Sequence, residues 1–200
     1  MSPRQFRMLS ASGVALMLTC TSAEAHTGTG LAGGFASGFV HPLTGLDHLL
    51  AMVSVGLWGA FLGRPLIYAL PVIFPGVMVL GAALGMFAVP LPTVEIGVAV
   101  SVLVLGACIA LSLRAPVWLA STIVAVFGIF HGYAHGRELP SAADPAGYSV
   151  GFVLATGMLH LAGVGIGLLN NMPRGVLVTR SLGGAIGVAG GWFLFRAVVS

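Results

Sequence analysis

The stretch His41-Pro42-Leu43-Thr44-Gly45-Leu46-Asp47-His48 brings together two imidazoles, a carboxylate, a helix breaker and a glycine. Apolar, glycine-rich sequence lies on both sides of it. Burying a carboxylate and two histidines in an apolar span is unfavourable, so ionisable residues at such positions usually mark a functional site. The stretch therefore predicts both a functional site and an interruption in the helix that carries it.

The composition is that of an integral membrane protein. Of the 200 residues, 58% are hydrophobic and only 6% are charged, whereas an ordinary globular domain is roughly 25% charged. All basic residues are arginine, and the net charge of +3 reflects arginines near span ends rather than a surface for nucleic acid. We predict an all-α integral membrane bundle of about six transmembrane helices, in contact with membrane lipid and not with nucleic acid.

Residues 1–25 have the pattern of a cleavable secretory signal peptide. A positive segment, a short apolar run and the small-x-small sequence Ala23-Glu24-Ala25 follow one another. An uncleaved first transmembrane helix is the alternative, but the apolar run is shorter than the roughly 20 residues that a span needs. Cleavage after Ala25 would leave His26 at the mature N-terminus, where the free amine and the imidazole could chelate a metal ion. A single terminal histidine more often has no function.

The remaining chain, residues 26–200, is predicted to be a single transmembrane domain. Pro42 removes a backbone N–H and clashes with the preceding turn, so the first helix is expected to break at His41–Pro42. An unbroken helix over residues 30–63 would be about 50 Å long, against a hydrocarbon core of roughly 30 Å, so we interpret this segment as one broken span. The predicted spans are 30–63, 66–87, 94–113, 116–135, 148–169 and 179–199.

The charged residues between the spans favour a single crossing for residues 30–63. With the mature N-terminus outside, four arginines fall in the cytoplasm and three acidic residues fall outside, in accord with the positive-inside rule. The residues concerned are Arg64, Arg114, Arg174 and Arg180 on the inside, and Glu95, Glu138 and Asp144 on the outside. A full hairpin over residues 30–63 would invert all these assignments. We predict a multi-pass protein of the bacterial inner membrane with a periplasmic mature N-terminus.

His41 and His48 are candidate metal ligands. In an intact helix they would share a face but lie about 10.5 Å apart, too far for one ion whose bonds are about 2.1 Å long. Either the helix break folds them together, or each pairs with ligands from another helix. Asp47 could ligate the ion directly or accept the second ring N–H of a histidine and fix its tautomer. The alternative without metal is a proline kink whose histidines bind freed carbonyls, but a carboxylate is unnecessary for that.

A second candidate set lies in the stretch Phe130-His131-Gly132-Tyr133-Ala134-His135-Gly136-Arg137-Glu138. His131 and His135 are four residues apart, the helical spacing that lets two imidazoles chelate one ion. Glu138 continues their stripe if the helix persists. Glycines at 128, 132 and 136 run beside the histidines and would let a partner helix pack closely. The alternative is that these histidines are simply solvated at a helix end.

The ligand types indicate the class of ion. Imidazoles assisted by carboxylates suit nickel, cobalt, zinc or copper(II) better than magnesium or calcium. His160 is a lone histidine in the middle of the span 148–169, and it is either a satisfied core residue or part of an ion pathway. A transport site must also release its ion, so several separated histidines suit a series of sites. No nucleotide-binding loop or ATPase motif is visible in the sequence.

At these residues the sequence resembles the HupE/UreJ family of nickel/cobalt permeases. The resemblance rests on His26 after the predicted signal peptide, on His41-Pro42-x-x-Gly45-x-Asp47-His48, and on Phe130-His131-Gly132-x-Ala134-His135-Gly136-x-Glu138. It covers essentially the whole mature chain. It implies secondary transport of nickel or cobalt into the cell, often to supply hydrogenase or urease maturation. It also implies that the histidines and carboxylates of both motifs are needed for transport.

We therefore predict a secondary transporter, and not an enzyme, that imports nickel and/or cobalt ions through a His/Asp-lined path. The central site is predicted to consist of His41, Asp47 and His48, and a second or capture site nearer the outside is predicted to consist of His131, His135 and Glu138. The ion is cargo that binds transiently, and no cofactor is expected. Alternatives are an intramembrane metalloenzyme holding a zinc-type ion, a metal efflux carrier, and a metal-responsive membrane partner without transport.

Overall fold

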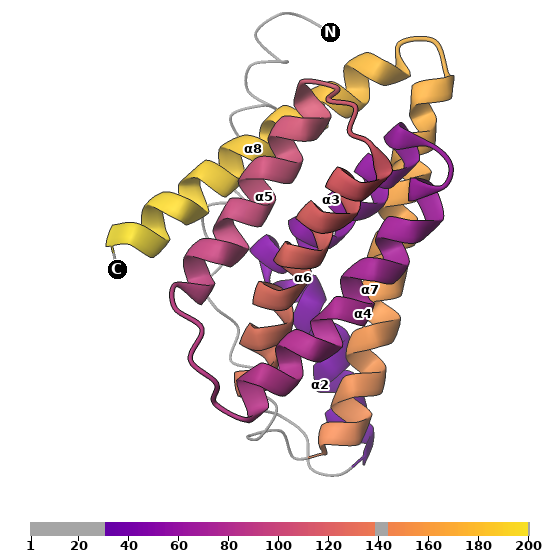
Figure 1. Ribbon diagram of the computed structural model, residues 1–200. Coiled ribbons are helices and arrows are strands. Elements are labelled where there is room, and N and C mark those ends of the chain that lie inside the picture. Colours follow the sequence, from indigo (N-terminus) through magenta and orange to yellow (C-terminus); the bar gives the residue numbers. More distant parts are fainter. Residues whose placement is uncertain (1–30, 139–143, 200) are drawn as a thin grey trace, which may run out of the picture.

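The computed structural model describes residues 31–138 and 144–199. The predicted signal peptide, its cleavage site and His26 lie outside these residues. Every regular element in the described segments is a helix, which confirms the predicted all-α fold (Figure 1). The helices are α2 (Leu31–Thr44), α3 (Leu46–Leu62), α4 (Leu66–Met86), α5 (Val94–Ala110), α6 (Val117–Glu138), α7 (Pro145–Gly167), the 3-10 helix η2 (Leu168–Asn171) and α8 (Gly175–Val199).

The predicted spans coincide with helical segments whose ends differ by a few residues. The clearest differences are that α6 continues to Glu138 and that α8 begins at Gly175. Four of the described helices (α4, α6, α7 with η2, and α8) are long and apolar enough to cross a membrane, and the bent pair α2 and α3 has the length and composition of a fifth span if the two helices cross together. The apolar α5 has 17 residues and would extend about 25 Å. The chain is a multi-pass membrane protein.

Gly45 separates the two halves of the first span. The axes of α2 and α3 differ by 78°, so the predicted break is confirmed, but α2 passes through Pro42 and ends at Thr44. The break therefore lies a few residues after the predicted position. Pro42 removes a donor from the last turn of α2, and Thr44 Oγ1 donates to the carbonyl of His41 at 3.1 Å. Gly45 then takes an extended conformation (φ −76°, ψ 102°) from which α3 starts.

Glycines allow three pairs of helices to bring their backbones into contact. The pairs are α4 with α6, α5 with α8, and the broken span with α7. A Cβ atom added to Gly132 of α6 would collide with the backbone of Met78 of α4. Gly106 of α5 and Gly187 of α8 meet in the same way. The close packing predicted from the glycine spacing is thus confirmed.

The order of these contacts shows that α2 and α3 make one pass along α7. Gly38 of α2 contacts the backbone of Tyr148 near the start of α7, and Gly56 of α3 contacts that of His160 further along. Both helices therefore follow α7 in the same direction, whereas a hairpin would send α3 back. By the same argument α4 runs parallel to α6, and α5 runs antiparallel to α8. An alternating six-pass bundle has these three relationships.

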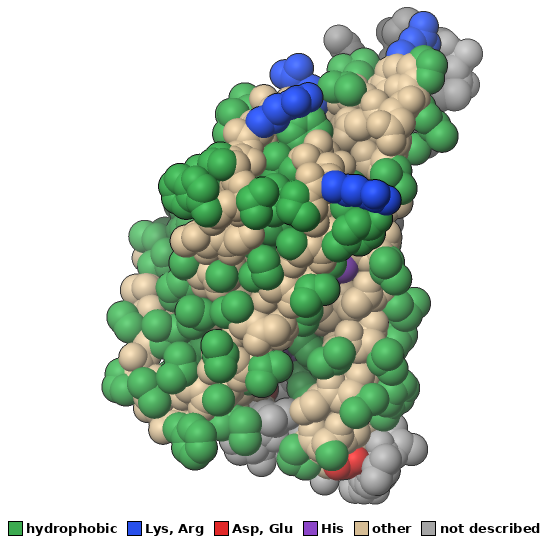
Figure 2. Space-filling view, turned by 45° about the vertical axis from the view of Figure 1, so that its right-hand side comes forward, with side chains coloured by type: hydrophobic (Ala, Val, Ile, Leu, Met, Phe, Trp, Pro, Cys, Tyr) green, Lys and Arg blue, Asp and Glu red, His purple; other side chains and the backbone are tan. Residues whose placement is uncertain are grey.

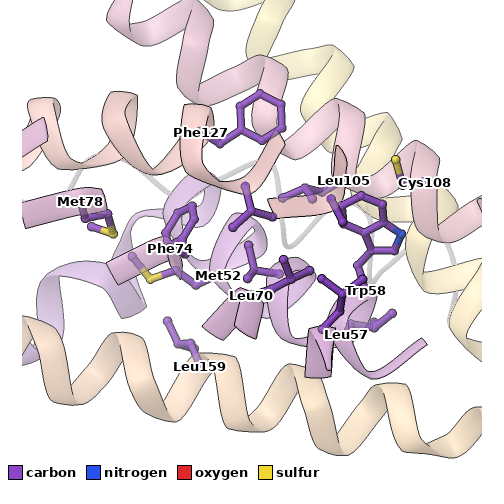
Figure 3. Close-up of a cluster of buried hydrophobic side chains, with 14 of the residues drawn as sticks. Met52, Leu57, Trp58, Leu70, Phe74, Met78, Leu105, Cys108, Phe127 and Leu159 are labelled. Carbon is purple, nitrogen blue, oxygen red and sulfur yellow. The ribbon is translucent and has the colours of Figure 1, made fainter. Parts of the chain in front are cut away.

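A central apolar core joins the helices, and its largest fully buried side chains are Trp58 and Phe74 (Figure 3). Trp58 Nε1 donates to the carbonyl of Leu113 at 3.2 Å, which satisfies the only polar atom of its side chain. On the face shown in Figure 2, arginine side chains lie in the upper part, an acidic side chain lies at the lower end, and hydrophobic side chains cover the surface between them. This distribution suits a bundle that spans a membrane.

Candidate metal site

Four histidines from three helices form one continuous cluster. The ring of His48 on α3 lies between the rings of His131 and His135 on α6, with centroid distances of 4.8 and 4.6 Å. The ring of His41 on α2 follows at 5.0 Å from His135 and lies 6.1 Å from His48. Both possibilities left open by the sequence are realised. The helix break brings His41 and His48 together, and each of them also pairs with a histidine of another helix.

The sequence predicts two separate sites, whereas the structure interleaves the two motifs in one cluster. His135 of the second motif contacts both His41 and His48 of the first. The physical reason is the 78° bend at Gly45, which lets the end of α2 and the start of α3 both approach the last turns of α6. The predicted division into a central site and a capture site is corrected accordingly.

Glu138 lies on the outer side of this cluster. Its Oε2 atom is 3.3 Å from Nε2 of His41 and 3.6 Å from Nδ1 of His135. One ligand atom from each of these three residues lies within 4.8 Å of the other two, an arrangement that could hold a metal ion. Because α6 remains helical to Glu138, the predicted continuation of the histidine stripe is confirmed.

Asp47 positions His48. Its Oδ1 atom accepts hydrogen bonds from the backbone N–H of His48 at 2.8 Å and from the ring Nδ1–H at 2.9 Å. A proton on Nδ1 leaves the lone pair on Nε2, and that buried atom has no hydrogen-bond partner among the described residues. Carboxylates commonly orient metal-binding histidines in this way. Asp47 is less buried than its sequence context suggests, since 39% of its side chain is exposed.

Ser101 of α5 orients the ring of His131, as Asp47 orients the ring of His48. Ser101 Oγ donates its single proton to the carbonyl of Val98 at 2.6 Å, so its 2.8 Å contact with Nε2 of His131 requires the histidine to donate. The lone pair of His131 is then on Nδ1, which is buried and unpartnered in the described part of the chain. The sequence analysis missed this residue. A serine within an apolar run is a weak signal that could have pointed to it.

The resemblance to nickel/cobalt permeases implies that the cluster handles nickel. Replacing Ser101 with alanine is then expected to raise the apparent KM for nickel uptake about tenfold, because the tautomer of His131 is no longer fixed. The measurement is the concentration dependence of nickel uptake. Ser54→Ala is the matched control, since Ser54 is equally buried and its hydroxyl has no hydrogen-bond partner among the described residues. Equal KM values for the two variants would contradict the role of Ser101.

Exposure decreases along the cluster from one end to the other. The exposed fraction of the side chain is 53% for Glu138, 23% for His41, 13% for His48 and 6% for His135, and His131 is fully buried. Aromatic rings enclose the buried end. Phe152 lies 4.2 Å from His135, and Phe74 lies 5.3 Å from His131. Neither aromatic residue could be assigned to the site from sequence, because apolar residues fill most positions of these spans.

His160 lies outside the cluster. Its ring contacts Phe74 at 5.5 Å, and Phe74 also contacts His131, so this phenylalanine lies between the two histidines. His26, the other histidine predicted as a possible ligand, lies outside the described residues.

Comparison with known proteins matches residues 14–193 to the family described as HupE / UreJ protein. The chain belongs to the HupE/UreJ family. Protein HupE of Rhizobium leguminosarum bv. viciae is 41% identical over 167 residues, which cover 83% of this chain and 87% of that protein. No solved structure matches the chain. The resemblance read from the two motifs is thus confirmed, and the HupE/UreJ family is of the transporter type, related to nickel and cobalt transport.

Proposed function

We propose that this protein is a secondary transporter that imports nickel and/or cobalt ions across the bacterial inner membrane. One observation carries the proposal: both sequence motifs converge on a single cluster, and three of its buried ring nitrogens have no hydrogen-bond partner among the described residues. These atoms are Nε2 of His48, Nδ1 of His131 and Nε2 of His135. Buried polar atoms are normally hydrogen-bonded, and a passing metal ion would satisfy them in turn.

The spacing of the rings is compatible with a shared ion. With a metal–nitrogen bond of about 2.1 Å, two imidazoles bound at right angles have centroids about 4.6 Å apart. The distances from His135 to His48 and to His41 are 4.6 and 5.0 Å. Glu138 adds a carboxylate oxygen near two of these three rings. Nitrogen ligands with an added carboxylate oxygen suit nickel and cobalt, and they do not suit magnesium or calcium.

The gradient of burial supports transport rather than permanent binding. An ion would meet the exposed Glu138 and His41 first, then His135 and His48, and finally the buried His131. Neighbouring rings are close enough to share an ion. As the ion moves along the cluster, it can therefore bind the next histidine before it leaves the previous one. Such a series of partial sites binds strongly enough for capture and weakly enough for release.

The charges support an inward direction. In the proposed orientation the mature N-terminus is periplasmic, and Arg64, Arg114, Arg174 and Arg180 face the cytoplasm. The exposed end of the cluster, at the end of α6 and the start of α7, then opens towards the periplasm. The imported ion would be available for hydrogenase or urease maturation, in keeping with the resemblance that the motifs carry.

The function is tested by uptake of labelled nickel in a host that lacks its own nickel transporters. Cells expressing the protein are expected to accumulate nickel at least tenfold above cells with an empty vector, and an excess of cobalt should block this accumulation. Loss of preloaded nickel instead would identify an efflux carrier. Stoichiometric metal that survives purification and dialysis, without uptake, would favour the metalloenzyme alternative.

A further inference from the structure

Two polar side chains deeper in the bundle have no role in the cluster. Thr156 and His160 of α7 are each 1% exposed, and Oγ1 of Thr156 and both ring nitrogens of His160 lack hydrogen-bond partners among the described residues. They lie four residues apart and so share one face of α7. Buried polar atoms without partners are rare, and in a membrane span they usually mark a pathway.

A cavity of about 110 Å³ reaches both α7 and the histidine cluster, and its wall includes His135 of α6 and Thr156 of α7. Most of its lining is apolar, and the lining residue Val153 is exposed on the surface of the bundle. The cavity therefore places Thr156 beside the cluster. His160 does not line the cavity, and it is related to the cluster through the ring of Phe74.

His160 lies deeper in the bundle than the cluster. Phe152, which contacts His135, precedes His160 by about 12 Å along α7, whereas the deepest histidine of the cluster, His131, lies one turn or about 6 Å from His135 along α6. The backbone of His160 packs against Gly56 of α3, and its ring packs against Phe74 of α4. The side chain is thus held between the two halves of the bundle at a depth that the cluster does not reach.

The available ligand atoms suit a weak site. His160 offers an imidazole nitrogen and Thr156 a hydroxyl oxygen, and waters that accompany the ion would complete the coordination. One imidazole with several oxygen ligands binds nickel or cobalt less tightly than the multi-histidine cluster does.

We propose that His160 and Thr156 form a second, inner ion site, which receives the nickel or cobalt ion from the buried end of the histidine cluster. This inference rests on the proposed transport function and extends it from capture to passage across the membrane. The inner site is the weaker of the two, so the ion moves on from it towards the side of the membrane that carries Arg64, Arg114 and Arg174.

The test combines equilibrium dialysis of purified full-length protein against nickel with nickel uptake in proteoliposomes. The wild type is expected to bind one equivalent tightly and a second at least tenfold more weakly. His160→Ala should lose the weaker equivalent, keep the tighter one, and take up nickel at least tenfold more slowly. Thr156→Val, which keeps the shape of the side chain, should weaken the second equivalent about fivefold or more. Leu161→Ala, at a neighbouring position that is 70% exposed, is the control and should match the wild type.

The outcomes separate the inner site from the function on which it rests. A single equivalent in a wild type that transports nickel overturns the inner site, and so does wild-type uptake by His160→Ala. His160→Gln is measured in parallel, because glutamine fills most of the same space. If the alanine variant loses both equivalents while His160→Gln keeps both, His160 is structural and the inner site is overturned. A wild type that neither binds nor transports nickel or cobalt contradicts the proposed function itself.

Discussion

Replacing His48 with alanine is expected to reduce nickel uptake more than about 100-fold, to the level of cells that lack the transporter. His48 is the only histidine in the described segments whose ring contacts three others of the cluster, His41, His131 and His135. Its removal interrupts the series between the exposed and the buried end. Loss of residues that merely orient a metal ligand already lowers affinity about 10–100-fold, and loss of a central ligand should exceed that.

Uptake of labelled nickel is measured together with the amount of protein in the membrane fraction, so that loss of transport is distinguished from loss of insertion. Asp47→Asn is an informative companion, because the amide oxygen can still accept the Nδ1–H of His48 while the negative charge is removed. We expect it to keep about a tenth of the wild-type rate. Wild-type uptake by a correctly inserted His48→Ala variant would remove His48 from the site.

Much of the fold could be predicted because few structures are possible for apolar segments inside a membrane. A membrane admits only helices whose backbone groups are satisfied internally, so span length and charge sufficed to place α4, α6 and α7 within a few residues. The break in the first span was also predictable from Pro42, but its position was not. Proline disturbs the turn that precedes it, whereas the glycine at 45 provides the extended conformation at which the chain changes direction.

The geometry of the site was beyond the sequence for a different reason. Helical spacing shows which residues of one helix share a face, and it placed His131, His135 and Glu138 along one stripe of α6. It does not show which faces of different helices meet. The contact of His48 with His131 joins positions 83 residues apart. The hydrogen bond between Ser101 and His131 joins α5 to α6, and both of these helices are apolar. Three-dimensional packing alone brings these groups together.

The glycines are a second example of a contact whose partner the sequence does not identify. The four-residue spacing of glycines 128, 132 and 136 predicted a close helix contact on α6, and the structure identifies α4 as the partner. Small residues permit a close approach without specifying what approaches. On other faces of the bundle, glycines such as Gly157 meet nothing within 4 Å. Glycine spacing therefore predicts where backbones can meet, and the structure is needed to tell contact glycines from lipid-facing ones.

This distinction gives the second large prediction, that Gly132→Val will strongly destabilise the fold and abolish transport. A Cβ at this position collides with the backbone of Met78, which cannot move aside as a flexible side chain could. Helices α4 and α6 must then separate, and His131 and His135 move with α6. Overpacking in a core costs about 1–3 kcal/mol, occasionally more, and a collision with backbone belongs at the upper end. We expect a strongly lowered thermal unfolding temperature in detergent and no measurable nickel uptake.

Gly157→Val is the matched control, because it introduces the same side chain into a helix interior where a Cβ meets nothing within 4 Å. The two variants share the change in helix propensity and differ in whether the added atoms meet a neighbouring helix. Gly157→Val should therefore keep wild-type stability and uptake, and Gly132→Ala should fall between the wild type and Gly132→Val. If Gly132→Val matched Gly157→Val in unfolding temperature and uptake, the contact of α4 with α6 could not be what holds the two histidines of α6 in the cluster.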